Sequence, residues 1–158
     1  TLRLLLVDTP ESVKKGVDPQ PYSIEASNFA KNTLKAGDTV YIEYDEGDKT
    51  DKYDRYLGYL WYYSKDDSNW QMFNETLISQ GYARVGYIYS QKRHLDEFYK
   101  AQDYAKSNKL NIWSVDGYVT DRGYDVDAYN SNKNTSSNSS SSSNNIVYAN
   151  ICSCFWKV

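Results

Sequence analysis

The sequence contains few of the residues that cross-link or catalyse in many small proteins. Among its 158 residues are two cysteines, three prolines and one histidine. Cys152 and Cys154 are too close together for an easy disulfide, and two cysteines are too few for a zinc site. A catalytic His94 would need a partner that the sequence does not offer, so we expect this residue on a helix surface.

Long apolar runs and an excess of positive charge are also absent. The run Leu4–Val7 is far shorter than the roughly 20 residues of a membrane-spanning helix. The formal net charge is -3, so a polyanionic partner must meet a local patch or a metal ion rather than a basic surface. The sequence starts at Thr1, next to the first apolar residues, and we interpret it as a fragment or a processed form.

The C-terminal part of the chain is polar and of low complexity. Every residue from 130 to 145 is Ser, Asn, Thr or Lys, which cannot bury enough apolar surface to offset the entropy of ordering. We therefore predict a folded domain over residues 1–120, a flexible Ser/Asn-rich linker over residues 121–145, and a short tail over residues 146–158 that could be the stub of a second module. Most of the 17 tyrosines are attributed to structure.

Hydrophobic periodicity indicates a mixed fold. The run Leu2–Val7 is typical of a buried strand, and apolar residues at steps of three and four predict a helix from Tyr22 to Leu34, capped by Ser23. Alternating apolar residues predict two paired strands, at Thr39–Tyr44 and Tyr56–Tyr63. Apolar residues at helical spacing predict two further helices, at Phe73–Gln80 and Leu95–Ala105. Because strands and helices do not alternate regularly, the predicted class is α+β with about three helices.

The most informative segment is Arg3–Glu11, where an apolar strand has an arginine at one end and carboxylates at the other. On a straight strand Arg3 and Asp8 would lie roughly 16 Å apart on opposite faces, so they converge only if the strand bends. The cluster Thr50–Arg55 contains a second arginine, and two guanidinium forks match the oxygens of one phosphodiester. Both segments also have a purely structural interpretation: the charges of Arg3–Glu11 could be surface charges at strand ends, and Thr50–Arg55 could be a solvated hairpin loop.

The segment Arg3–Glu11 resembles the signature of the staphylococcal nuclease (thermonuclease) family, and further segments agree with that family in order and spacing. These are Lys14–Val17, Glu25–Ser27, Thr50–Tyr53 with Arg55, Tyr87–Tyr89 and Leu110–Ser114. The resemblance runs from about Leu2 to Ser114. It implies an OB-fold five-stranded barrel, with its N-terminal strands missing from this chain, and a calcium-dependent phosphodiesterase that cuts DNA and RNA to 3′-phosphates.

The resemblance also implies roles for individual residues. Asp8 would ligate calcium through its carboxylate and Thr9 through its backbone carbonyl. Glu11 would orient or deprotonate the attacking water. Arg3 and Arg55 would hold the scissile phosphate and stabilise the charge that develops in the transition state.

Four more residues would contact the substrate. Lys52 and Tyr53 would bind a terminal phosphate, and Tyr87 and Tyr89 would line the nucleotide pocket. The expected partners are single-stranded or locally melted DNA and RNA, with no membrane span. The family resemblance suggests a secreted protein, and we expect a monomer.

Two departures from the family pattern keep a second hypothesis open, a non-catalytic nucleic-acid-binding OB module. The family has another calcium-ligating aspartate upstream of Arg3; the similar turn Gly37–Val40 follows the first helix and is not assigned that role. Asp54 stands where the family usually has glycine, and its charge beside Arg55 would weaken phosphate binding, although aspartate tolerates a positive φ angle. Without upstream strands we expect residues 1–158 alone to be marginally stable.

Overall fold

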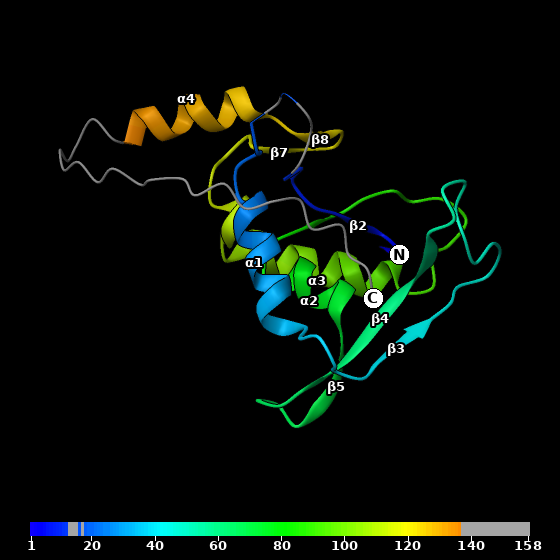
Figure 1. Ribbon diagram of the computed structural model, residues 1–158. Helices are drawn as coiled ribbons and strands as arrows, with labels where there is room; N and C mark the ends of the chain where they lie inside the picture. The colour runs from blue at the N-terminus through cyan, green and yellow to red at the C-terminus, as the bar shows by residue number, and fades with distance from the viewer. Residues whose placement is uncertain (13–15, 17, 137–158) are drawn as a thin grey trace.

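The computed structural model describes residues 1–12, 16 and 18–136, and it contains short strands packed beside helices (Figure 1). Of the segment Lys14–Val17 only Gly16 is described, and the predicted tail lies outside the described residues. In chain order the elements are β1 (Leu2–Leu4), β2 (Val7–Asp8), α1 (Ser23–Thr33), β3 (Val40–Glu43), β4 (Tyr56–Ser64), β5 (Asn69–Met72), α2 (Phe73–Ser79), β6 (Arg84–Val85), α3 (Leu95–Ser107), the 3-10 helix η1 (Asn111–Trp113), β7 (Val119–Thr120), β8 (Gly123–Tyr124) and α4 (Val126–Ser136).

The central sheet is organised around the long strand β4. The start of β4 pairs in parallel with β1, and later residues of β4 pair antiparallel with β3 and with β5. β2 pairs with β6, and β7 pairs with β8, in two separate ladders. The α+β class is therefore confirmed. Since the strands of the described residues do not form one closed ring, the five-stranded OB barrel stays a prediction.

The predicted strand Leu2–Val7 is divided into two strands, which corrects the sequence interpretation. Leu6 has a φ angle of 60°, which interrupts the extended backbone between β1 and β2. The Leu6 side chain is almost fully buried, so the break is held within the core rather than in solvent. β1 can therefore pair with β4 while β2 pairs with β6.

The predicted helices are present, and their apolar faces form the core. The helix expected at Tyr22–Leu34 is α1, but its N-cap is Tyr22 rather than Ser23, whose hydroxyl donates to the Gln20 carbonyl at 2.6 Å. α2 packs against α3 and β4. The largest fully buried apolar and aromatic side chains are Leu6, Tyr59, Ile78, Phe98, Ile112 and Tyr118.

A fourth helix, α4, lies within the segment that composition assigns to the linker. The Asp125 carboxylate accepts a hydrogen bond from the Ala128 amide at 2.9 Å, which caps the start of α4. The Tyr129 ring lies 5.1 Å from the Tyr118 ring and 6.1 Å from the Tyr22 ring. Figure 1 shows α4 and the β7–β8 hairpin at the end of the molecule where α1 begins. Tertiary contacts thus order part of a very polar segment.

Helix length and hydropathy also bear on membrane insertion. In the portion of the chain that the structure describes, no helix is both long enough and apolar enough to cross a membrane.

Candidate active site

A cleft of about 420 Å³ brings together residues from segments far apart in the sequence. β1 and the segment after it form one wall, and the rest of the lining comes from α1, from α2, from Leu60 in β4, and from Arg55 and Tyr87. Predicted site residues that line the cleft are Arg3, Asp8, Thr9, Glu11, Arg55 and Tyr87. The remaining predicted residues, Lys52, Tyr53 and Tyr89, do not line it.

The two arginines converge because of the parallel register between β1 and β4. Leu2 lies opposite Tyr56 and Arg3 lies opposite Leu57. Arg55 directly precedes Tyr56, so alternation places Arg55 on the same side of the ladder as Arg3. Both guanidinium groups can therefore reach one ligand in the cleft, and this requires a pairing between residues more than fifty positions apart.

Arg55 is held in place by Asp51. The Asp51 Oδ2 atom accepts from Nε of Arg55 at 2.7 Å and contacts Nη2 at 2.6 Å, while Oδ1 accepts from the amides of Tyr53 and Arg55. Burial acts to raise the pKa of Asp51, but the hydrogen bonds from Arg55 and from the two amides outweigh it and lower the pKa to about 2. A fixed carboxylate therefore orients the guanidinium before any ligand binds.

Asp54 differs in its role from Asp51. Its φ angle is 56°, a left-handed conformation that aspartate tolerates better than most residues. The carboxylate that pairs with Arg55 is Asp51, not Asp54. The sequence analysis assigned no role to Asp51, although it belongs to the motif Thr50–Tyr53.

Asn74 connects the strand break to the sheet. This side chain is completely buried. Its Nδ2 donates to the carbonyl of Leu5 at 3.0 Å and, at 3.4 Å, to that of Gly58, and its Oδ1 accepts from the amide of Leu60 at 2.9 Å. One amide group thereby satisfies backbone atoms at the end of β1 and in β4. It fixes where β1 ends, and hence the distance from Arg3 to Asp8.

Asp8 is positioned by the β2–β6 ladder. It lies opposite Arg84, whose Nε and Nη2 both bind the Oδ2 atom of Asp8, at 2.8 and 2.7 Å. Gly86, two residues after Arg84, passes so close that a Cβ there would lie 2.6 Å from the Cβ of Asp8. Neither Arg84 nor Gly86 was predicted, since no local spacing links them to Asp8.

Tyr87 completes the rim of the cleft. Its ring lies under the guanidinium of Arg3, with 4.2 Å between Cζ and the ring centroid, and it is half exposed. Tyr87 also has a φ angle of 54°. This conformation is uncommon for an aromatic residue, and sites of backbone strain of this kind cluster at functional positions.

The other three predicted substrate residues lie outside the cleft. Tyr53 is 66% exposed, and its ring is near both Lys52 and Arg55, at 5.0 Å from Nζ and 5.3 Å from Cζ. Tyr53 is therefore connected to the cleft through Arg55. Tyr89 is 67% exposed, two residues beyond Tyr87. All three are accessible to a large ligand.

The oxygen atoms near Asp8 suit a hard cation. Asp8 and Thr9 line the cleft together with Glu11, whose amide donates to Oε1 of Gln20 at 2.7 Å. Carboxylate and carbonyl oxygens are the ligands that calcium prefers. Within the described ranges, no three acidic, histidine or cysteine side chains gather closely enough to hold a metal ion. Any cation here would rely on water for several ligands.

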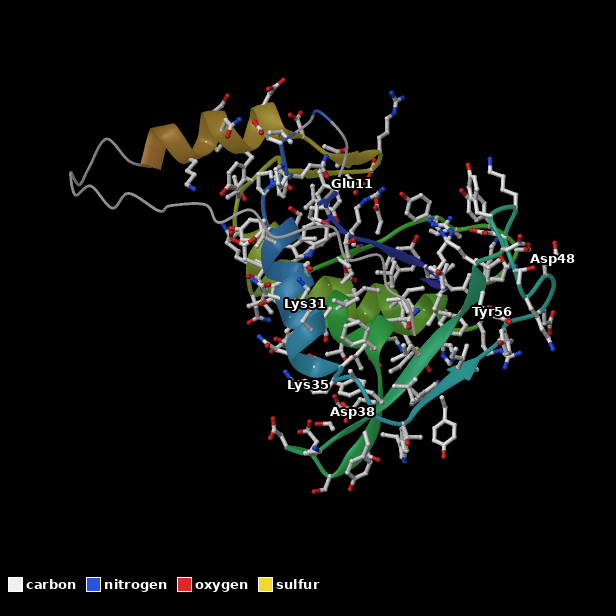
Figure 2. All side chains as sticks on the ribbon, viewed as in Figure 1. Glu11, Lys31, Lys35, Asp38, Asp48 and Tyr56 are labelled. Carbon is white, nitrogen blue, oxygen red and sulfur yellow. The ribbon has the colours of Figure 1, made fainter. Side chains whose placement is uncertain are left out.

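The turn Gly37–Val40 takes no part in this site. Figure 2 shows Asp38 at the opposite end of the molecule from Glu11. Asp38 Oδ2 accepts a hydrogen bond from the amide of Lys35 at 2.9 Å, just after α1. Asp38 therefore does not lie with the residues of the cleft.

The fold and the cleft together define a small α+β protein whose paired arginines and neighbouring carboxylates suit a phosphate-containing ligand. The chain belongs to the staphylococcal nuclease family, since the model described as staphylococcal nuclease homologue matches residues 1–115.

Curated relatives agree with this assignment. The SPbeta prophage-derived endonuclease YokF of Bacillus subtilis is 43% identical over 125 residues, which cover 78% of this chain and 40% of the relative. Endonuclease YncB of the same organism is 42% identical over 125 residues, which cover 78% of this chain and 56% of the relative. The thermonuclease of Staphylococcus hyicus is 40% identical over 113 residues, which cover 72% of this chain and 62% of the relative. The chain thus spans about half the length of these relatives.

Proposed function

We propose that this protein is a calcium-dependent nuclease that hydrolyses phosphodiester bonds of DNA and RNA and leaves 3′-phosphates. The observation that carries the proposal is the convergence of Arg3, Arg55, Asp8 and Glu11 on one cleft. Relatives named endonuclease and thermonuclease support the same reaction class. Single-stranded or locally melted nucleic acid is the proposed substrate, because a base must leave the stack to contact Tyr87 and Tyr89.

The arginines are proposed to stabilise the transition state. Hydrolysis of a phosphodiester adds negative charge to the oxygens around phosphorus as the water attacks. Arg55, fixed by Asp51, and Arg3, stacked on Tyr87, meet that charge without first having to reorganise. Binding that strengthens as charge develops lowers the barrier more than it tightens the ground state.

Glu11 is the proposed general base or water-orienting residue. It lines the cleft on the segment that follows β2, and the β1–β2 break lies between it and Arg3 in the chain. A carboxylate in this place can accept a proton from a water molecule that approaches the phosphate. Lys52 and Tyr53 are proposed to bind a terminal phosphate beside Arg55.

Calcium is the proposed cofactor, and the donor set fits it. Both contacts from Arg84 go to Oδ2 of Asp8, which leaves Oδ1 as the carboxylate oxygen for a cation, and the Thr9 carbonyl lies on the next residue. When bound, the ion would polarise the phosphate as a Lewis acid. Arg84 weakens the site electrostatically, because it already neutralises part of the charge of Asp8.

The direct test is cleavage of single-stranded DNA with and without a calcium chelator. We expect activity that needs calcium, a fall of about 10²–10⁴-fold in Glu11→Gln, and about 10²–10³-fold in Arg55→Ala. Glu46→Gln, an exposed carboxylate in the β3–β4 loop, is the matched control and should keep full activity. Normal rates in both cleft variants would refute the assigned roles.

The second candidate is a non-catalytic nucleic-acid-binding module of the same family. The observation that favours it is the pairing of Asp8 with Arg84, which competes with a cation for that carboxylate. A protein that binds labelled single strands with salt-dependent affinity, yet cleaves nothing in calcium, would support this candidate over the enzyme.

Three finer points also belong to the proposal and rest on the family resemblance. They are the OB barrel, secretion, and a monomeric state. The mixed pairing of β4, with a parallel neighbour at its start and antiparallel neighbours further along, is consistent with a barrel of this type. Fractionation of the source cells and size-exclusion chromatography test the last two.

A further inference from the structure

A second pocket lies beside the candidate active site. It has a volume of about 450 Å³, within the range of small-molecule sites. β6 and the residues after it, α3, η1 and the β7–β8 hairpin form its walls. The hairpin contributes Val119–Asp121 to the lining. These residues follow residues 1–115, the part of the chain that matches the family, so the pocket is formed partly by residues outside that match.

The hairpin is attached to the candidate active site by specific bonds. Nη1 of Arg84 donates to the carbonyl of Asp121 at 3.3 Å, while its Nε and Nη2 hold Asp8. From β8, the hydroxyl of Tyr124 donates to the carbonyl of Asp8 at 2.6 Å. The second pocket and the metal-ligand candidate therefore share one supporting structure.

Tyr87 makes the two cavities neighbours. It lines both the cleft and the second pocket, and its ring already carries Arg3 at 4.2 Å. A flexible chain that leaves the cleft past Tyr87 would enter the second pocket next. Continuity of this kind suits a polymeric ligand rather than a separate small molecule.

The lining of the second pocket combines cations with aromatic rings. Arg84 and Lys106 are its positive residues, and Asp121 is its one acidic residue. Nζ of Lys106 lies 4.8 Å from the ring centroid of Trp113, and Tyr99 is 41% exposed. Positive groups beside stacking platforms are the usual means by which proteins hold single-stranded nucleic acid.

Trp113 supplies a polar group that the fold does not satisfy. Its Nε1 atom is fully buried and has no hydrogen-bond partner among the residues that the structure describes. A buried donor of this kind is costly unless an acceptor reaches it. Phosphate and base oxygens are acceptors of the required type.

We propose that the second pocket is a nucleotide subsite, which binds the base and phosphate of a substrate nucleotide next to the one held in the cleft. The inference rests on the proposed function. Lys106 pairs with the phosphate, Tyr99 stacks on the base, and Nε1 of Trp113 donates to an oxygen of the nucleotide. The β7–β8 hairpin therefore extends the substrate track beyond the part of the chain that matches the family.

The test measures how cleavage and binding depend on substrate length. Labelled oligothymidylates from about two to about eight nucleotides are assayed for kcat/KM, and their affinity is measured by fluorescence anisotropy in a Glu11→Gln background. For Tyr99→Ala we expect about a tenfold loss on long substrates and none on the shortest. For Lys106→Gln we expect weaker binding of long substrates and a salt dependence reduced by about one phosphate contact.

The matched control is Lys100→Gln, an exposed lysine of the same helix that does not line the pocket. Tyr99 and Lys106 are both exposed, so their variants should fold, and circular dichroism checks this. If Tyr99→Ala and Lys106→Gln keep the length and salt dependence of the control, the subsite is refuted. If the wild-type protein cuts no oligonucleotide, the proposed nuclease function fails, and the anisotropy data still decide the subsite.

Discussion

The buried amide of Asn74 is expected to be essential for stability. It serves three backbone atoms in a place that the structure closes to solvent, at the carbonyls of Leu5 and Gly58 and the amide of Leu60. The Gly58 carbonyl also accepts from the Leu5 amide at 3.1 Å, so it keeps a partner without Asn74. Replacement of Asn74 therefore leaves two buried backbone groups unsatisfied.

The expected magnitude follows from those two groups. An unsatisfied buried donor or acceptor costs about 1–3 kcal/mol, so Asn74→Ala should lower the free energy of unfolding by roughly 2–6 kcal/mol. Asn74→Leu keeps the number and branching of side-chain heavy atoms and has no hydrogen-bonding atoms, so it leaves no cavity and separates the lost hydrogen bonds from a cavity effect. We expect both variants to fall by similar amounts. For a domain with a total of about 5–15 kcal/mol this is a large loss.

Urea unfolding followed by circular dichroism measures the effect. Asn28→Ala, on the exposed face of α1, is the control and should change stability by less than about 0.5 kcal/mol. Because Asn74 also fixes the end of β1, the proposed nuclease activity should fall in the Asn74 variants even under conditions where they stay folded. An Asn74→Leu protein as stable as the wild type would refute this reasoning.

Three further predictions concern the supports of the cleft. Gly86→Ala should reduce the proposed nuclease activity and the proposed calcium affinity, because its Cβ would force Asp8 to move. Calorimetric titration with calcium measures the affinity. The folded-state pKa of Asp51, about 2, lies below its ordinary value of 3.8, so its contribution to stability is present above about pH 4 and lost as the pH falls toward 2. Asp51→Asn should flatten that part of an acid-unfolding curve. Tyr124→Phe removes the hydrogen bond to the Asp8 carbonyl and should lower the free energy of unfolding by about 1 kcal/mol. Thermal unfolding measures this loss.

A large part of the fold could be predicted from local pattern. The apolar steps of α1 and α3 and the alternation around β3 and β4 are short-range signals, since a helix or strand face repeats within a few residues. Local composition failed at α4, because a polar segment becomes ordered there through an Asp125 cap and the contacts of Tyr129 with rings near α1. The local periodicity of apolar residues does not encode contacts between residues that are about a hundred positions apart in the sequence.

The sequence by itself determined which chemical groups are available and the family to which they belong. The motif from Arg3 to Glu11 and the arginine at position 55 are visible in the order of residues, and the family match agrees with them. Only the tertiary structure decided how they are arranged. Parallel register places Arg55 beside Arg3, and the β2–β6 ladder places Arg84 on Asp8, because both depend on backbone pairing between distant segments. Sequence spacing carries no information about such pairings until the topology is known.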